Sequence, residues 1–270
     1  MPFDQHYDVA IVGGGLAGSA LAIAMARGGS SVIVIERDAD YRDRVRGEWL
    51  APWGVTDARK LGLLDVLDAA GAHVLPAIAG RSGRPLHEET PEGDLARTFF
   101  HPTLQQALID EAERAGATIA RPARVREVTP ATDGKQPSVR FDYDGDSIEV
   151  SARLVVGADG RTSLVRTALG QPAREHRSER MLTGVRLANV GGDPEMGYLI
   201  VSPEPGGLTA LFPQGDGHAR AYLFTHEADN SAYRGDDGLR HFLDTAVGIG
   251  LPAEVVENAT AAGPLAAFSA

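Results

Sequence analysis

The feature that most constrains the fold is a cluster of glycines placed directly after a short apolar segment. Residues 8–12 read DVAIV, which is typical of a buried parallel strand, and the pattern G-x-G-x-x-G follows at once. In this pattern Gly13 permits a tight turn, and Gly15 lets a pyrophosphate approach the backbone. Gly18 lets the following helix pack closely against the strand. The segment therefore predicts a phosphate-binding turn.

The next residues complete a strand–helix–strand unit. Residues 19–27 are rich in Ala and Leu and predict a helix that ends at Gly28, and residues 31–35 predict a second strand. The free N–H groups and the positive dipole end of the helix would face a phosphate. Glu36 follows the second strand, at about the spacing from the glycines expected for a carboxylate that binds ribose hydroxyls. A glycine pattern alone can be an ordinary loop, but the strands, the helix and the acidic residue together predict a dinucleotide site.

Composition limits the class of protein. The chain has 270 residues, with 43% hydrophobic and 23% charged residues, as in a soluble globular protein of one large or two ordinary domains. A net charge of −11 argues against a nucleic acid or an anionic membrane as partner. The absence of cysteine excludes disulfides and thiolate metal sites, and it fits a reducing compartment.

One segment has the length of a membrane span. Residues 9–26 carry no charge over 18 positions, but the glycine cluster lies in the middle, where a turn explains it better. No Lys or Arg precedes it, as the basic region of a signal peptide would. We therefore expect a buried strand and helix, no integral membrane segment, and a cytoplasmic protein.

The middle of the chain alternates between helical and extended patterns. Residues 55–70 predict a helix, and residues 74–100 suggest short strands of a separate sheet. A further helix should begin at His101 and stop at Gly116, and Asp144-Gly145 predicts a hairpin turn.

The last part of the chain has another texture. Residues 153–156 predict a strand whose carboxyl end carries Asp159, the place where open α/β sheets bind ligands. From Met181 on, short strands alternate with Gly and Pro turns, which indicates an antiparallel sheet, and residues 238–247 predict an amphipathic helix. We therefore predict an α/β protein with a Rossmann-type βαβ domain and a second, inserted antiparallel β-sheet domain.

Three motifs resemble those of the group A flavoprotein monooxygenases, which share the fold of para-hydroxybenzoate hydroxylase. The first is VAIVGGGLAGSALA with the Glu36-Arg37 pair, and the second is the 44–47 loop, RVRG, running into LAPWGVTDARKLGLLD. The third is GADGRTSLVR at residues 157–166. The glycine pattern alone is shared by many enzymes, but its pairing with the third motif is far more specific.

The resemblance implies two discontinuous domains and a bound FAD. Residues 1–73 and 101–180 would form the FAD-binding domain, and residues 74–100 and 181–270 the substrate-binding sheet domain. FAD would lie extended across the first sheet. Its contacts would come from Gly13, Gly14, Gly15, Leu16, Ala17, Gly18, Glu36, Arg37, Arg44, Arg46, Gly47, His101, Gln105, Val125 and Asp159.

Several of these residues have a second interpretation. Arg44 and Arg46 could neutralise a pyrophosphate or simply belong to a solvated basic loop. His101 stands where the family usually has Arg or Gln, and the alternative is an N-terminal helix cap. For Gln105, one turn later, a solvated side chain is the preferred interpretation. The alternative for Asp159 is a structural turn aspartate.

The resemblance also implies a reaction. NADH or NADPH would reduce the flavin, O₂ would add at C4a, and the hydroperoxyflavin would hydroxylate an aromatic or polycyclic small molecule. The cofactor does this chemistry, so no protein nucleophile or metal is required. The chain has no G-x-S-x-G or H-E-x-x-H pattern, and its eight histidines lack metal-ligand spacing. The substrate would face the strand containing Phe212, which can equally be a plain core strand. The oligomeric state stays open.

Other functions remain possible within and outside flavin chemistry. Flavin-dependent halogenases carry W-x-W-x-I-P in this sheet and geranylgeranyl reductases carry Y-x-W-x-F-P, whereas residues 207–213 read GLTALFP without a tryptophan. This difference favours oxygenation. A non-catalytic flavin-binding module is the alternative from another class.

One further motif of the family is missing from this chain. It is a Gly-Asp pair that ends a strand and opens a glycine-rich helix beside the flavin. The chain has five Gly-Asp pairs, and none of them has this context. We therefore expect this chain to lack the C-terminal part that completes the flavin pocket.

Overall fold

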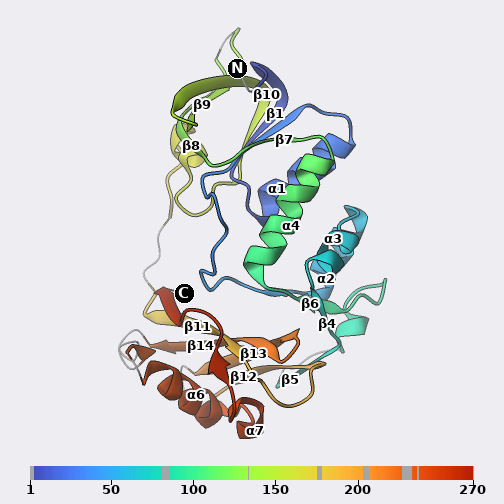
Figure 1. Cartoon of the computed structure of the whole chain (residues 1–270), viewed down its shortest axis with the longest axis vertical. Helices are drawn as coiled ribbons and strands as arrows, with labels where there is room; N and C mark the ends of the chain where they lie inside the picture. The colour runs from blue at the N-terminus through green and yellow to red at the C-terminus, as the bar shows by residue number, and fades with distance from the viewer. Residues whose placement is uncertain are drawn as a thin grey trace. The chain divides into compact units, whose positions relative to one another are not determined.

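The computed structural model describes residues 3–80, 85–132, 134–174, 178–202, 207–226, 233–235 and 237–269. The chain divides into two compact units, both drawn in Figure 1. Unit 1 comprises Met1–Arg42 and Pro102–Glu175, and unit 2 comprises Asp43–His101 and His176–Ala270.

Unit 1 is built on a six-stranded sheet. The strand order among its described residues is β7-β2-β1-β10-β9-β8, with β1, β2, β7 and the second half of β10 parallel and the β8–β9–β10 meander antiparallel. The strands are β1 (His6–Val12), β2 (Val32–Ile35), β7 (Thr118–Ala120), β8 (Ala123–Thr129), β9 (Ser138–Tyr143) and β10 (Asp146–Gly157). This mixed sheet, with a parallel βαβ unit at its centre, confirms the predicted α/β class.

Strand β10 joins two segments that the sequence predicts as separate strands. Its first half pairs with β9 through the Asp144-Gly145 hairpin, and its second half pairs with β1 from Ser151 to Gly157. Asp144 and Gly145 both have positive φ, as this type of turn requires. The long strand thus carries the chain from the hairpin to the centre of the sheet.

Three helices belong to this unit: α1 (Leu16–Arg27), α4 (His101–Arg114), whose first residue belongs to unit 2, and α5 (Leu164–Ala168). Helix α1 begins at Leu16, three residues earlier than predicted, because Gly15 already serves as its N-cap residue. Helices α1 and α4 lie side by side (Figure 1), and Arg27 forms an ion pair with Glu111 at 2.6 Å. The core of the sheet includes Phe141, which is fully buried.

Unit 2 contains a seven-stranded, mostly antiparallel sheet. The order among its described residues is β15-β11-β14-β13-β12-β5, with β16 also paired to β11. The strands are β5 (Ala77–Ala79), β11 (Arg180–Ala188), β12 (Met196–Val201), β13 (Leu208–Gly215), β14 (His218–His226), β15 (Thr260–Ala261) and β16 (Ala266–Ser269). The predicted antiparallel texture from Met181 on is thus confirmed.

Different segments of unit 2 pack against the two faces of this sheet. Alternate residues of a strand point to opposite faces, so Leu211 and Leu223 pack with Phe242 of α6 (Gly238–Ile249), while Phe212 and Tyr222 point the other way. The short helix α7 (Ala253–Val256) joins α6 on the first face (Figure 1). The second face packs against residues from the start of unit 2, including Val45, Leu75 and Leu86.

A small three-stranded sheet and two helices complete unit 2. Its strands, β3 (Trp49–Leu50), β6 (Ala96–Thr98) and β4 (His73–Leu75), pair in the order β3-β6-β4, and a 3₁₀ turn covers Leu86–Glu88. The single helix predicted over residues 55–70 is two helices, α2 (Pro52–Lys60) and α3 (Leu64–Ala69). The break falls at Gly62, which has φ +66° and so leaves the helical region.

Residues 43–73 lie in unit 2, although the sequence assigns them to the nucleotide-binding part. The reason is strand pairing and burial: Trp49 and Leu50 pair with β6, and the Glu48 side chain is fully buried within this unit. Among the described residues, no helix combines the length and apolar character needed to cross a bilayer.

Candidate FAD-binding site

The glycine turn between β1 and α1 is shaped by two close backbone contacts. A Cβ atom at Gly13, which has φ +105°, would lie 2.4 Å from the carbonyl oxygen of Ala158. A Cβ atom at Gly18 would lie 1.9 Å from the Gly13 carbonyl oxygen. Neither position can hold a side chain without moving backbone. The turn is thereby pressed against the loop that contains Asp159.

Gly15 lies in the opposite situation. Its φ of −73° is ordinary, and a Cβ atom there would meet no atom within 4 Å. The glycine is therefore not required by the packing of the chain itself. It keeps open the space above the N-terminus of α1, where Leu16 and Ala17 begin the helix and no acidic residue occupies the first turn. An anion fits this space because the free N–H groups and the helix dipole both favour it.

Glu36 directly follows β2 and is buried beneath the turn, with 8% of its surface exposed. Its Oε2 accepts a hydrogen bond from the Gly14 N–H at 2.6 Å, and its Oε1 accepts one from the Asp38 N–H at 2.7 Å. A carboxylate can accept about four hydrogen bonds, so each oxygen retains capacity for a ribose hydroxyl. Arg37, next in sequence, is exposed and contacts the Asp38 carboxylate at 3.3 Å.

The two carboxylate oxygens of Asp159 differ in their hydrogen bonding. Its Oδ2 accepts the N–H of Leu164 at 2.6 Å and so caps α5, with the Ser163 hydroxyl accepting from Arg166 at 3.0 Å. Its Oδ1 is buried and has no hydrogen-bond partner among the described residues. A buried acceptor without a donor is costly, and a donor from a bound ligand would satisfy it. The residues around the turn thus fit a dinucleotide.

Two residues that the sequence predicts as FAD contacts, Val125 and Gln105, lie on other elements of unit 1. Val125 sits in β8 opposite Phe141, beside an irregularity in the β8–β9 pairing, and packs against the core. Gln105 is half-buried on α4, and no hydrogen bond of its side chain is found among the described residues. Among the described residues, no hydrogen bond joins either of them to the glycine turn.

In unit 2, the loop that contains Arg44 and Arg46 is fixed by the residue between them. Val45 adopts φ +50°, is fully buried, and fills the space above Gly184, where a Cβ atom would lie 2.4 Å from its Cγ1. The Tyr222 hydroxyl donates to the carbonyl oxygen of Arg46. The side chains of Arg44 and Arg46 are both exposed as a result, and Gly47 beside them is exposed too.

A buried ion pair lies directly after this loop. Arg220 of β14 donates from Nε to Glu48 Oε2 at 2.8 Å and from Nη2 to Glu48 Oε1 at 3.0 Å, and both side chains are fully buried. Nη2 also donates to Asp43 at 2.8 Å, and the Gln214 amide donates to Glu48 at 2.5 Å. Burial alone would lower the pKa of Arg220, but the hydrogen bonds and charges of Glu48 and Asp43 raise it above its ordinary value.

The backbone of His101 is held by the same Glu48 carboxylate. Its backbone N–H donates to Glu48 Oε1 at 3.0 Å, so Glu48, and not the imidazole, caps the first turn of α4. The imidazole Nδ1 is buried without a partner among the described residues. Burial lowers the pKa of His101, against the opposing effects of the Gly47 carbonyl and the Glu48 charge. The helix-cap interpretation of the side chain is therefore wrong, and its contact with a cofactor stays a prediction.

Phe212 belongs to an aromatic layer on the same face of the large sheet. Its ring stacks on Trp49 with centroids 5.7 Å apart and planes 9° apart, and it meets Tyr222 edge-on at 6.3 Å. Only 7% of Phe212 is exposed, and burial raises the pKa of Tyr222. Phe212 is thus part of a packed core cluster.

Sequence reasoning missed Glu48, Arg220 and Gln214. One signal was present: Arg220 interrupts the apolar run of β14 between Ala219 and Ala221, and a charge in a buried strand requires a partner. The partner itself lies 172 residues away in the sequence and could not be identified from it.

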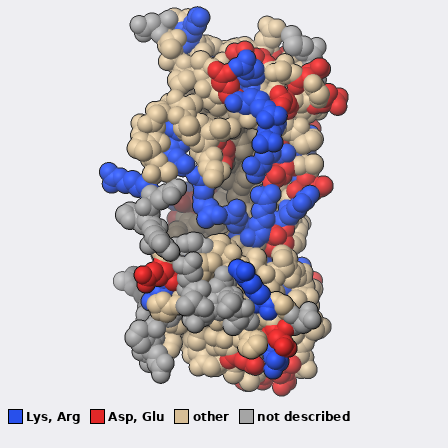
Figure 2. All heavy atoms as spheres, turned by 90° about the vertical axis from the view of Figure 1, so that its left-hand side faces the viewer, with Lys and Arg blue, Asp and Glu red and all other residues tan. Residues whose placement is uncertain are grey.

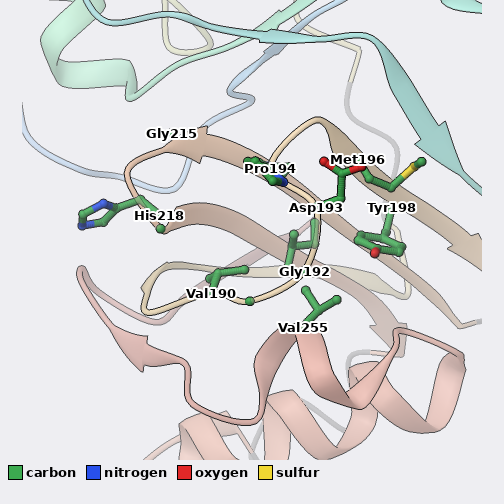
Figure 3. A pocket seen from close by; sticks show the side chains of 13 residues that line it. Val190, Gly192, Asp193, Pro194, Met196, Tyr198, Gly215, His218 and Val255 are labelled. Carbon is green, nitrogen blue, oxygen red and sulfur yellow. The ribbon is translucent and has the colours of Figure 1, made fainter.

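A cavity of about 240 Å³ lies on the other face of the large sheet, beside α7 (Figure 3). Tyr198, Leu211 and Val255 contribute apolar surface, and the 190–194 segment and the turn after β13 close it. None of the residues predicted to contact FAD lines this cavity.

The surface of the molecule carries both signs of charge. Figure 2 shows Lys and Arg side chains together with Asp and Glu side chains on one face. Exposed ion pairs such as Arg126 with Asp142, 2.6 Å apart, are part of this pattern.

Comparison with known proteins agrees with the geometry. Residues 6–260 match the family model described as FAD binding domain. Ubiquinone hydroxylase UbiL of Rhodospirillum rubrum is 34% identical over 179 residues, covering 62% of this chain and 40% of that protein. The 6-methylpretetramide 4-monooxygenase of Streptomyces rimosus is 33% identical over 217 residues, covering 72% of this chain and 50% of that protein. The chain thus spans half or less of the length of these relatives.

Solved structures share the fold. A ternary complex of aklavinone-11 hydroxylase with FAD and aklavinone superposes with a TM-score of 0.71 at 22% identity, covering 99% of this chain and 54% of that one. The myxobacterial halogenase CndH superposes with a TM-score of 0.77 at 21% identity, covering 98% of this chain and 64% of that one. With the match over residues 6–260, the hydroxylase relatives confirm the resemblance to group A flavoproteins, and the chain belongs to the FAD binding domain family.

Proposed function

We propose that this protein works as an FAD-dependent monooxygenase that uses NADH or NADPH and O₂ to hydroxylate an aromatic or polycyclic small molecule. The observation that carries the proposal is the pairing of an open space above Gly15 with the buried carboxylate of Glu36, in a chain of an FAD-binding family. The relatives named as hydroxylases and monooxygenases support the reaction class.

The proposed contacts fall into two groups. In unit 1 the glycine turn would bind the pyrophosphate and Glu36 the adenosine ribose, because their N–H groups and carboxylate oxygens match these partners. In unit 2 the exposed guanidinium groups of Arg44 and Arg46 would supply positive charge to neutralise the negative pyrophosphate of the flavin dinucleotide. The remaining proposed contacts are Arg37, Gly47, His101, Gln105, Val125 and Asp159.

FAD, once bound, supplies the redox chemistry that lets reduced flavin react with O₂. The residues of this chain would bind the cofactor, hold its orientation and exclude water. His101 suits a buried position of this kind because its lowered pKa keeps the imidazole neutral near pH 7, so that burying it adds no unpaired charge.

The substrate class is inferred from the relatives. One relative is named a 6-methylpretetramide 4-monooxygenase, and one solved structure of the same fold is a hydroxylase in complex with aklavinone. In the aromatic layer, Phe212 and Tyr222 belong to the buried core, and Trp49, which stacks on Phe212, would supply the aromatic surface for such a ring system. Trp49 is only partly buried, and its indole nitrogen has no partner among the described residues.

Halogenation or reduction is the second candidate, because CndH and a geranylgeranyl bacteriochlorophyll reductase-like protein share the fold. Identities of 19–21% support the fold alone. Strand β13 lacks the tryptophans that both groups carry, which favours oxygenation. A non-catalytic flavin-binding module is the third candidate.

The decisive experiment is a turnover assay of the FAD-loaded protein. NADH and NADPH oxidation is followed across a panel of phenols and polycyclic aromatics, in ¹⁸O₂, with and without chloride and bromide. We expect oxidation that increases with one compound class and a product heavier by one ¹⁸O atom. A halogenated product, or bound FAD with no NAD(P)H oxidation under any condition, would contradict hydroxylation.

A further inference from the structure

The peptide group between Gly14 and Gly15 lies at the centre of the proposed phosphate site. The cis peptide found in the described chain is elsewhere, so this one is trans, with its C=O and N–H pointing in opposite directions. The N–H of Gly15 has no hydrogen-bond partner among the described residues, and a Cβ atom on Gly15 would meet no atom within 4 Å. Whatever fixes the Gly14 carbonyl therefore also aims the Gly15 N–H.

Two side chains fix this carbonyl. The hydroxyl of Tyr41, in the loop after β2, donates to the Gly14 oxygen at 2.6 Å, and the fully buried Ser19 hydroxyl donates to it at 3.1 Å. The Gly14 N–H is held from below by Glu36. Both polar groups of Gly14 are thereby restrained, although a glycine would otherwise be the most mobile residue of the turn.

Tyr41 is itself held in place. The guanidinium of Arg121 lies over its ring, 4.1 Å from the centroid, as in a cation–π contact. Arg121 donates to the Asp38 carbonyl at 2.8 Å and to Gln106 on α4 at 2.9 Å. Burial, followed by the nearby Glu36 charge, raises the pKa of Tyr41, so its hydroxyl keeps the proton that it donates.

We propose that Tyr41 is a positioning residue for the FAD pyrophosphate, acting through the Gly14–Gly15 peptide, with Arg121 holding its ring. The hydroxyl fixes the carbonyl side of the peptide, and the direction of the opposite N–H is then set before the cofactor arrives. This preorganisation lowers the cost of ordering the turn on binding. The inference rests on the proposed binding of FAD at this turn.

The test separates the parts of the cofactor. Dissociation constants are measured for FAD, ADP and adenosine with wild-type protein and Tyr41→Phe, which keeps the ring and removes only the hydroxyl. Because the effect acts on the pyrophosphate, FAD and ADP should bind about 3- to 10-fold more weakly, the scale of one hydrogen bond. Adenosine, which has no phosphate, should bind as before.

Two further variants complete the design. Tyr7→Phe removes a hydroxyl of the same unit whose one hydrogen bond among the described residues comes from the Asp4 N–H, at 3.2 Å, and it should leave the affinities for all three ligands unchanged. Arg121→Gln should weaken FAD in the wild-type background and add little when combined with Tyr41→Phe, since both act through one hydroxyl.

The outcomes are distinct. Unchanged FAD affinity of Tyr41→Phe, in a wild-type protein that binds FAD, would overturn the inference alone. An equal loss for adenosine would also overturn it, because Tyr41 would then merely shape the pocket. Failure of the wild-type protein to bind FAD or ADP would contradict both the inference and the proposed function.

Discussion

Arg220 and Glu48 form a doubly hydrogen-bonded ion pair in which neither side chain is exposed to solvent. The same carboxylate caps α4 through the His101 N–H and accepts a hydrogen bond from Gln214. One buried carboxylate thus joins Arg220 of β14, Gln214 of β13 and His101, the first residue of α4. This arrangement fixes the segment directly after the exposed Arg44 and Arg46.

Breaking this pair should be strongly destabilising. Arg220→Met leaves Glu48 buried beside two weaker donors, and we expect the free energy of unfolding to fall by about 3–5 kcal/mol. The double variant Arg220→Met with Glu48→Gln removes the stranded charge and should recover part of the loss. Denaturant titrations of both variants measure this. A double variant that is less stable than Arg220→Met would contradict the account.

The close packing of Val45 against Gly184 predicts that a larger residue at position 184 lowers stability. A methyl group at residue 184 would lie 2.4 Å from Val45 Cγ1 and 3.0 Å from Tyr222, so Gly184→Ala should cost about 1–3 kcal/mol. Val45→Ala, added to it, makes room and should restore part of that stability. Gly248→Ala on α6 is the matched control, because a Cβ atom there meets nothing within 4 Å. Equal thermal stabilities of Gly184→Ala and Gly248→Ala would show that the packing is not tight.

The buried environment of His101 predicts that the stability of the protein depends on pH. Burial lowers the pKa of His101 below the ordinary histidine value of about 6.5, so the unfolded chain binds a proton more readily than the folded one. Stability should therefore be complete above about pH 6.5 and be lost as the pH falls toward the folded-state pKa. His101→Gln should reduce this dependence. An NMR titration of the His101 ring with a midpoint at or above 6.5 would exclude the explanation.

The sequence predicted the βαβ unit well because its signals are local. The strand of residues 8–12, the glycine turn and Glu36 follow one another within 30 residues, and each has a distinct requirement of geometry or charge. The helix break at Gly62 was missed because an isolated glycine is tolerated in many helices, and only its positive φ ends this one.

The parts that could not be predicted depend on distant contacts. Glu48 reads as one acidic residue in a polar loop, and only the fold brings Arg220 to it. Tyr41 likewise reads as an ordinary loop residue, and only the fold brings it beside Gly14 and under Arg121. Spacing rules do not encode such pairs, whereas they do encode the glycine turn.

Glu36 should contribute to both cofactor binding and stability. Glu36→Ala removes the acceptor for the Gly14 and Asp38 N–H groups together with the proposed ribose contact, and FAD should bind about tenfold or more weakly. Glu36→Gln keeps one carbonyl acceptor and should lose less. FAD titrations followed by flavin fluorescence compare the two. Equal and negligible losses would show that Glu36 does not contact the cofactor.

If the turn at residues 13–18 binds the FAD pyrophosphate, substitutions at Gly15 and Gly18 should have opposite effects on FAD affinity and on folding. A side chain at Gly15 meets open space, whereas one at Gly18 meets the Gly13 carbonyl oxygen at 1.9 Å. The measurement is an FAD titration of wild-type protein and Gly15→Val, each with a thermal melt, and with Gly18→Ala as the variant whose fold should suffer. We predict that Gly15→Val melts within a few degrees of the wild type and binds FAD at least about 100-fold more weakly, because the valine occupies the phosphate position. Near-normal FAD affinity of a folded Gly15→Val protein would contradict binding of the pyrophosphate at this turn.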